Sequence, residues 1–134
     1  HDMNFQLNKI KPNFVNRIDK FADKTKSATV EEMEKIYFNT NFAPCPAGFF
    51  HPESYRIYEA LQCGTIPIVE SVYNYFDNIY PNNPLIKINK WKEAKEIIDN
   101  WSDDQILNKR KECINWWNQY LLDHKNFVRE KIKE

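Results

Sequence analysis

Residues 42–71 read FAPCPAGFFHPESYRIYEALQCGTIPIVES, and they carry the clearest fold signal in this chain of 134 residues. The segment opens with a short apolar run at 42–45 that a proline ends, and it closes with the β-branched run 65–69. Between the two runs, residues 53–63 are good helix formers, and Gly64 follows as the residue type favoured just after a helix C-terminus. The segment therefore predicts a strand, a helix and a second strand, an order that places both strands parallel in one sheet.

Strands and helices alternate through the rest of the chain as well. Residues 4–10 alternate apolar and polar side chains as a short strand does, and residues 13–22 carry apolar side chains at helical spacing. Residues 29–32, TVEE, form a capping box that opens a further helix. The remaining expected elements are an edge strand at 85–88, a short helix at 90–100 and a long helix that begins with a capping signature at 102–105. We predict an α/β fold in a single domain of residues 1–134: a Rossmann-like parallel sheet with flanking helices on both faces and a long C-terminal helix.

Apolar residues recur every seven positions along this last helix, at Leu107, Ile114, Leu121 and Val128. The spacing fits either a coiled-coil seam or an amphipathic helix packed on the sheet, and the packed helix is the favoured interpretation. Trp116 and Trp117 cannot both be buried on one narrow helix face, so a helix that binds a partner stays open as an alternative.

The composition excludes several classes of function. Only 2 glycines are present, which rules out the glycine-rich phosphate loops of many nucleotide-binding proteins. The 19 basic and 19 acidic side chains cancel, so the overall charge predicts neither nucleic-acid binding nor membrane contact. The 3 cysteines form no Cys-x-x-Cys pair, which favours buried free thiols over a disulfide framework or a zinc site. Residues 1–3 resemble a cloning remnant ahead of an excised domain.

The loop between the first strand and the helix of the 42–71 segment has the properties of an anion site. A helix N-terminus near residues 52 and 53 presents unpaired N–H groups and the positive end of the helix dipole. Gly48 lets the backbone pass close to a ligand, and proline at 52 suits a first helical turn. Parallel α/β folds bind ligands beyond the carboxyl ends of their strands, where this loop lies. The segment therefore predicts a diphosphate site that needs no glycine-rich motif.

Side chains on the same helix are candidate contacts to a nucleotide. Arg56 and Glu59 lie three residues apart and share one helix face, so they can either pair with each other or bind a phosphate and a ribose diol. Tyr55 and Tyr58 flank them, and packing against the sheet is the favoured role for both. For the lone loop histidine His51, a solvated position is the default.

Three segments together carry a resemblance to a known family. PAG at 46–48, ESYRIYEAL at 53–61 and CGTIPIVE at 63–70 resemble the donor-binding signature of exostosin-like (GT47-type) glycosyltransferases. The likeness is greater still to the ribitol β-1,4-xylosyltransferases, and it extends more weakly over residues 30–130. The resemblance implies the two-domain GT-B architecture, with this chain as the C-terminal, donor-binding half and the N-terminal acceptor domain absent.

The resemblance also implies roles for individual residues. Gly48 and the backbone at Ser54 and Tyr55 would face the diphosphate of a nucleotide-sugar donor. Arg56 would neutralise phosphate charge, and Glu59 would hold the ribose hydroxyls. Further candidate contacts are His51, Glu53 and Glu70.

The activity implied by the resemblance is inverting transfer from a UDP-sugar, such as UDP-xylose, to a glycan acceptor, with no metal or other cofactor. Retaining GT-B families often carry an acidic residue eight positions before the ribose glutamate, and His51 occupies that position here. The catalytic base is expected on the N-terminal domain, so we expect this chain alone to be inactive. The implied location is the Golgi lumen for a eukaryotic parent and the cytoplasm otherwise. The alternatives are a non-catalytic module that binds sugar nucleotides or glycans, and a module that interacts through its last helix.

Overall fold

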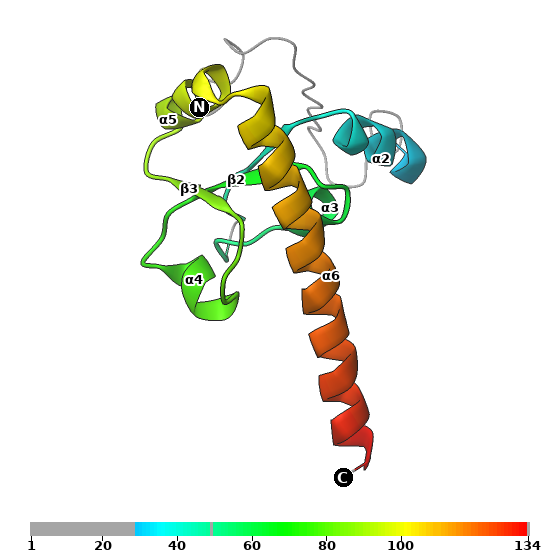
Figure 1. Ribbon diagram of the computed structural model, residues 1–134. Helices are drawn as coiled ribbons and strands as arrows, with labels where there is room; N and C mark the ends of the chain where they lie inside the picture. Colours follow the sequence, from blue (N-terminus) through cyan, green and yellow to red (C-terminus); the bar gives the residue numbers. More distant parts are fainter. Residues whose placement is uncertain (1–28, 49, 134) are drawn as a thin grey trace.

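A parallel sheet lies at the centre of the structure, a computed structural model that describes residues 29–48 and 50–133 (Figure 1). The strands are β1 (Phe42–Cys45), β2 (Ile66–Glu70) and β3 (Ile86–Ile88), in the order β1-β2-β3. All of the strand pairs are parallel, so the predicted α/β class and its edge strand are confirmed. The strand expected at 4–10 and the helix expected at 13–22 lie outside the described residues.

The helices of the described residues are α2 (Val30–Phe38), α3 (Tyr55–Gln62), α4 (Tyr75–Ile79), α5 (Lys92–Asn100) and α6 (Asp103–Lys133). Helix α2 begins at the predicted capping box, in which Thr29 Oγ1 accepts from the Glu32 N–H and the Glu32 carboxylate accepts from the Thr29 N–H. Ser102 and Gln105 form the same reciprocal pair at the start of α6. Both predicted helix starts are confirmed.

Two helices differ from the sequence prediction. Helix α3 starts at Tyr55, two residues after the predicted start at 53, because the N-cap Ser54 has extended backbone with φ −142° and ψ 161°. The single turn α4 was not predicted from the sequence. It follows Tyr73 and Asn74, whose φ angles of 46° and 58° place two consecutive non-glycine residues in the left-handed region.

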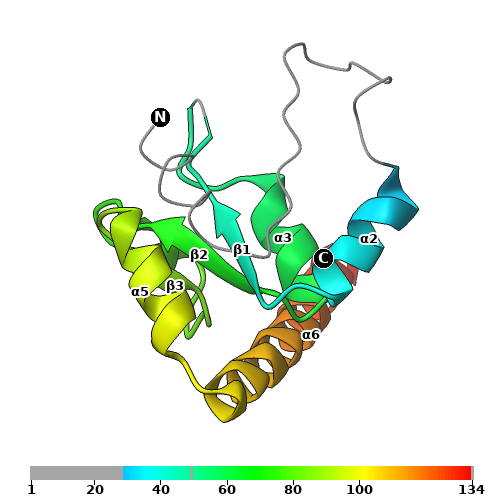
Figure 2. The ribbon, with the colours of Figure 1, turned by 90° about the horizontal axis from the view of Figure 1, so that it is seen from above.

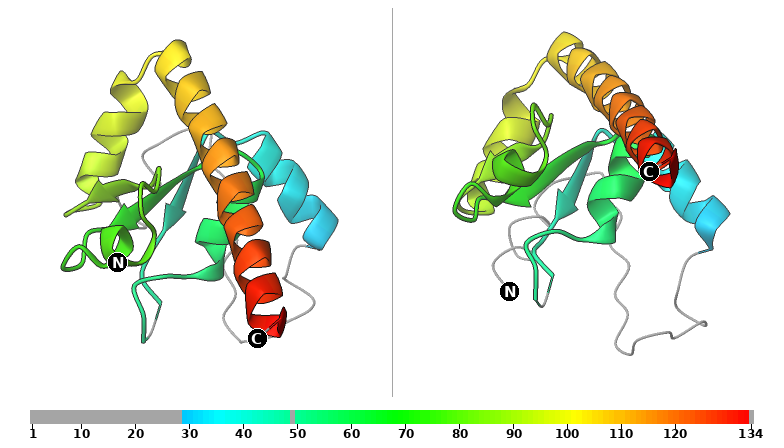
Figure 3. Two further views of the ribbon diagram at one scale, coloured as in Figure 1. Left: turned by 60° about the horizontal axis from the view of Figure 1, so that its bottom comes forward. Right: turned by 90° about the horizontal axis from the view of Figure 1, so that it is seen from below.

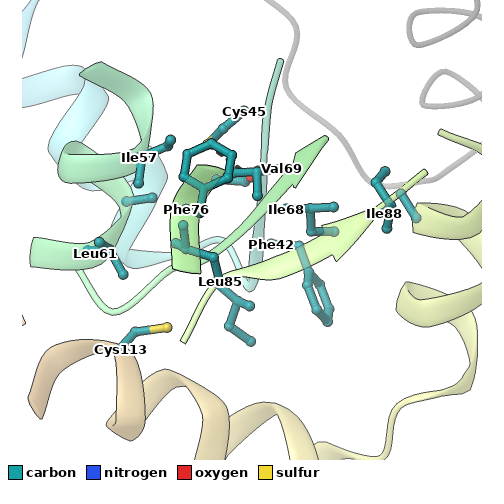
Figure 4. Packing of buried hydrophobic residues seen from close by; sticks show 14 of the residues in the cluster. Phe42, Cys45, Ile57, Leu61, Ile68, Val69, Phe76, Leu85, Ile88 and Cys113 are labelled. Carbon is teal, nitrogen blue, oxygen red and sulfur yellow. Dashed lines mark hydrogen bonds between the residues drawn. The ribbon is translucent and has the colours of Figure 1, made fainter. Parts of the chain in front are cut away.

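Alternate residues of each strand point to opposite faces of the sheet, and different helical segments cover the two faces. On one side Val69 of β2 lies with Ile57 of α3 and Phe76 of α4 (Figure 4). On the other side Phe42 of β1 packs edge-on against Trp101, which follows α5, with 5.8 Å between ring centroids. Helices α5 and α6 diverge from their junction (Figure 3).

The long helix α6 packs on α3 and β2, which confirms the favoured interpretation of a packed helix, but it does so through a face next to the predicted stripe. Its packed side contains Ile106, Cys113 and Tyr120, which are also seven residues apart, and Cys113 is fully buried. The predicted stripe lies one residue further around the helix, and its members are 40–51% exposed: Leu107, Ile114, Leu121 and Val128. Residues 121–133 are exposed throughout, and α6 extends beyond the sheet (Figure 1). None of the described helices is long and apolar enough to cross a membrane.

Aromatic side chains explain why α6 packs through this face. Trp116 lies edge-on to Tyr80 with 6.0 Å between ring centroids, and its indole N–H donates to the Pro81 carbonyl at 3.0 Å. The ring centroids of Trp117 and of Tyr58, which belongs to α3, lie 5.7 Å apart. The two tryptophans contact different neighbours, and both are therefore half-buried. These large rings bury more apolar area than the aliphatic stripe would.

The guanidinium of Arg110 on α6 joins three parts of the chain. Its Nε donates to the Gly64 carbonyl at 2.7 Å, just after α3, and one terminal nitrogen donates to the carbonyl of Phe38, the last residue of α2, at 2.9 Å. The other terminal nitrogen donates to Asn41 Oδ1 at 3.1 Å, immediately before β1. A cation beside the C-terminal carbonyls of helices is also favoured by the helix dipole.

The cysteines are free and buried, which confirms the interpretation of buried free thiols. Burial raises the pKa of Cys45 and that of Cys113 to about 12, and it also raises the pKa of Cys63. The three thiols are therefore protonated and unreactive near neutral pH in the folded chain.

Gly64 should be hard to replace, because its φ is +67° and a Cβ there would lie 2.7 Å from Ile114 Cδ1. Gly64→Ala should lower the free energy of unfolding by about 1–3 kcal/mol, from left-handed strain and overpacking together. Urea denaturation measures the change. Combining Gly64→Ala with Ile114→Ala removes the clash and leaves the strain, so the alanine at 64 should then cost less. An unchanged urea midpoint for Gly64→Ala would contradict this account.

Candidate functional site

The candidate site lies where β1 and β2 end, beside the N-terminus of α3. Residues 46–48 and 50–54 lie between the end of β1 and the start of α3 (Figure 2). Residues 71–74 follow β2 at the same edge of the sheet, because the strands are parallel. This is the edge at which parallel α/β folds bind ligands.

Gly48 closes a tight turn in this loop. Its N–H donates to the His51 carbonyl at 2.9 Å. A Cβ at this position would lie 3.2 Å from that carbonyl oxygen and 3.3 Å from the Glu53 carbonyl oxygen, so any side chain would crowd two backbone groups. The His51 side chain is exposed, and the residue contributes its carbonyl to the turn. A side chain at 48 would therefore require these backbone groups to shift by a few tenths of an ångström.

The N-terminus of α3 is open toward this loop. Ser54 occupies the N-cap position, but its side chain makes no capping hydrogen bond. Its Oγ is buried and has no hydrogen-bond partner within the described residues. Buried hydroxyls normally have a hydrogen-bond partner, and the first N–H groups of a helix have no acceptor within the helix. The local structure therefore leaves several hydrogen-bond donors available to an anion.

Arg56 places a positive charge at the positive end of the same helix. It is the second residue of α3, its side chain is exposed, and it makes no ion pair within residues 29–48 and 50–133. The surface pair with Glu59 that the spacing allowed is not formed. A cation in the first turn of a helix is unfavourable without a counter-ion, so the guanidinium of Arg56 at this end of α3 is available to pair with an anion.

Glu59 lies one turn further along α3 and is held by a residue far away in the sequence. The Tyr37 hydroxyl of α2 donates to Glu59 Oε2 at 3.1 Å. The other carboxylate oxygen accepts no hydrogen bond from the described residues. Glu59 is exposed whereas Tyr37 is only 9% exposed, so a fixed buried phenol orients an accessible carboxylate.

The two tyrosines that flank these residues differ in environment. Tyr55 is 84% exposed, so the expected packing against the sheet is wrong for this residue. Tyr58 is half-buried and packs against the hydrophobic core, and its ring also contacts Trp117 of α6 and Tyr80. Tyr55 therefore leaves an aromatic ring in solvent beside the open helix end.

The Glu53 carboxylate is enclosed by tyrosines, a feature that the sequence did not indicate. Its Oε2 accepts hydrogen bonds from the hydroxyls of Tyr58, at 3.0 Å, and Tyr80, and the two hydroxyls also contact each other. Burial raises the pKa of Tyr58 to about 12, and burial and the Glu53 contact raise the pKa of Tyr80, so both phenols stay protonated as donors. The carboxylate thereby ties the loop before α3 to the segment after α4.

Glu70, at the end of β2, is also engaged by another side chain. Its Oε1 accepts from the Trp91 indole N–H at 2.6 Å. Trp91 is 6% exposed and precedes α5, so this bond fixes the start of that helix against the sheet. Within the described residues, Glu53 and Glu70 thus have structural partners, whereas Arg56 and the second oxygen of Glu59 do not.

The comparisons with known proteins identify the family. The family model described as RXYLT1 C-terminal domain matches residues 4–134. The chain belongs to this family. It is 24% identical over 130 residues to ribitol-5-phosphate xylosyltransferase 1 of Danio rerio, an alignment that covers 87% of the chain and 30% of that relative. It is 23% identical over 129 residues to the enzyme of the same name from Mus musculus, with 84% of the chain and 29% of the relative covered.

The chain therefore spans about 30% of the length of these curated relatives. No solved structure matches it. The resemblance to ribitol xylosyltransferases is confirmed by the family model and by both relatives.

Glu53→Ala should lower the free energy of unfolding by about 1–3 kcal/mol, because it leaves two tyrosine hydroxyls without their carboxylate acceptor. Tyr58→Phe is the matched control. It removes one donor while Tyr80 keeps its bond to Glu53, so it should cost only about 0.5–1.5 kcal/mol. Both changes are measured by urea denaturation, and an equal cost for the two variants would contradict the central role of the carboxylate.

Proposed function

We propose that this chain is the donor-binding domain of a xylosyltransferase-type glycosyltransferase, and that it binds a UDP-sugar such as UDP-xylose. The observation that carries the proposal is the unpaired guanidinium of Arg56 at the start of α3. Arg56 has no counter-ion there within the described residues, and the buried Ser54 hydroxyl has no partner. A diphosphate would supply acceptors to both groups and to the first N–H groups of the helix.

The remaining contacts follow from the geometry of α3. Glu59 shares a helix face with Arg56, and one of its oxygens is available to hydroxyl donors such as a ribose diol. Gly48 keeps the loop clear of side-chain atoms beside the helix end. In this arrangement the nucleotide lies along the first turns of α3, with its phosphates at Ser54 and Arg56 and its ribose at Glu59.

The proposed reaction is inverting transfer of the sugar to a glycan acceptor. The acceptor hydroxyl attacks the anomeric carbon, the bond to the diphosphate breaks, and the negative charge that develops on the leaving group is stabilised by Arg56 and the dipole of α3. This stabilisation does not depend on a metal. We expect the base that takes the hydroxyl proton, and most of the acceptor site, to come from an N-terminal domain of the parent enzyme. The name of the two relatives suggests an acceptor that carries ribitol 5-phosphate, and a Golgi lumen location is proposed for a eukaryotic parent.

A second candidate function is interaction through α6. Leu121, Leu122, Phe127 and Val128 are 42–59% exposed on the part of this helix that extends beyond the sheet. Exposed apolar side chains of this kind are typical of contact surfaces. Sedimentation of the purified chain tests this function, which predicts self-association that Leu121→Lys abolishes.

Titration with UDP, GDP and their sugar conjugates, followed by calorimetry and thermal shift, tests the donor site. UDP compounds should stabilise the chain, and Glu59→Ala should weaken their binding by about 1–3 kcal/mol through loss of a hydrogen-bond partner. Arg56→Ala should weaken binding as well and reduce its dependence on salt, because a charge contact to phosphate is lost.

Glu96→Ala is the matched control for Glu59→Ala, since Glu96 is an exposed glutamate on a different helix, α5. It should leave the affinity unchanged. The proposal fails if no member of the panel binds to the wild-type chain, or if Glu96→Ala weakens binding as much as Glu59→Ala does.

A further inference from the structure

Helix α2 brings one buried hydroxyl group to the candidate ribose contact. Tyr37 is the last buried residue of α2, and its hydroxyl donates to Glu59 Oε2 at 3.1 Å. The two residues are separated by 22 positions and belong to different helices. No local sequence motif links them, so the contact exists only in the folded chain.

The tyrosine is fixed from several directions. The Thr65 hydroxyl, at the start of β2, donates to the Tyr37 carbonyl, and Thr65 is fully buried. The next carbonyl, that of Phe38, accepts from Arg110 of α6 at 2.9 Å. The backbone that carries Tyr37 is therefore attached to both the sheet and α6, and the buried ring has little freedom to move.

Glu59, by contrast, is an exposed side chain with several rotatable bonds. An exposed glutamate samples several rotamers, and each of them would direct its oxygens differently. The hydrogen bond from Tyr37 selects the rotamers in which Oε2 faces α2, which leaves Oε1 for a ligand. A carboxylate ordered in advance binds a diol with a smaller loss of entropy than a mobile one.

We propose that Tyr37 is a positioning residue for the donor ribose, acting through Glu59, and this inference rests on the proposed function of Glu59. Tyr37 need not touch the nucleotide. Its hydroxyl restrains one carboxylate oxygen so that the other can receive the ribose hydroxyls.

The groups around the phenol are compatible with this role. Burial, and then the neighbouring Glu59 and Cys45, raise the pKa of Tyr37, and the charge of Arg56 offsets only part of this rise. The hydroxyl therefore remains a donor throughout the physiological pH range. If the Tyr37 hydroxyl only satisfied its own hydrogen bond, its removal would destabilise the fold without changing the affinity for the ribose. A structural role and a positioning role therefore predict different ligand affinities for a variant without the hydroxyl.

The test compares UDP with 2′,3′-dideoxy-UDP on the 134-residue chain by calorimetry. Tyr37→Phe keeps the ring and removes the hydroxyl, and it should weaken UDP binding about three- to tenfold, the range expected for one lost hydrogen bond. Its effect on the dideoxy analogue should be less than about twofold, because that ligand offers no ribose hydroxyls to Glu59. In a Glu59→Ala background, which has no acceptor for the Tyr37 hydroxyl, Tyr37→Phe should cause much less further loss than in the wild type.

Tyr120→Phe is the control, since it removes a tyrosine hydroxyl on α6 and should leave both affinities unchanged. Circular dichroism melting of each variant establishes that it is folded. The inference is overturned if Tyr37→Phe leaves UDP binding unchanged, weakens both ligands equally, or loses as much affinity in the Glu59→Ala background as in the wild type. Absence of UDP binding to the wild-type chain is a different result, because it overturns the donor site itself and the role of Tyr37 with it.

Discussion

The fork of hydrogen bonds from Arg110 holds together the parts of this domain that are distant in sequence. The side chain reaches from α6 to the carbonyl of Gly64, to the carbonyl of Phe38 and to the side chain of Asn41. Only a guanidinium offers several donors in a fixed plane, so lysine could not satisfy all of these acceptors at once. Because the end of α2 is attached in this way, Tyr37 reaches Glu59 in a defined position. The candidate site at the N-terminus of α3 therefore depends on the contacts of Arg110 at the opposite, C-terminal end of the helix.

Two carboxylate–tyrosine contacts hold α3 near its open end. Before the helix, Glu53 binds the hydroxyls of Tyr58 and Tyr80, and within it Glu59 binds Tyr37. Both contacts give a carboxylate oxygen a hydrogen-bond donor without supplying a positive charge, since a protonated phenol is a neutral donor. Arg56, by contrast, makes no ion pair within the described residues, and its guanidinium lies at the positive end of the α3 dipole. Such an arrangement suits a ligand that brings its own negative charge.

The features that the sequence predicted are those encoded within a few neighbouring residues. The capping boxes at Thr29 and Ser102 and the β-branched strand before Glu70 all depend on short-range geometry, and the structure has each of them. The face of α6 was harder to predict, because the stripe that includes Leu121 and the packed side that includes Tyr120 have the same seven-residue spacing. Only the position of the neighbouring aromatic rings decides between them. The contacts at Glu53 and Glu59 could not have been derived at all, since each joins segments that folding alone brings together.

The 2 glycines of the chain show how strictly α3 is placed. At Gly48 a side chain would crowd the carbonyls of the loop that enters the helix, and at Gly64, where φ is +67°, it would collide with Ile114 of α6. Glycine disfavours folding because it has more conformational freedom to lose than other residues, so a sequence that otherwise does without it gains nothing from these residues unless the geometry demands them. Both demands concern the same helix, one at its entry and one just past its end. A helix fixed at both ends can direct its N–H groups at a ligand without first being ordered by that ligand, which is the condition under which a helix N-terminus binds a diphosphate well.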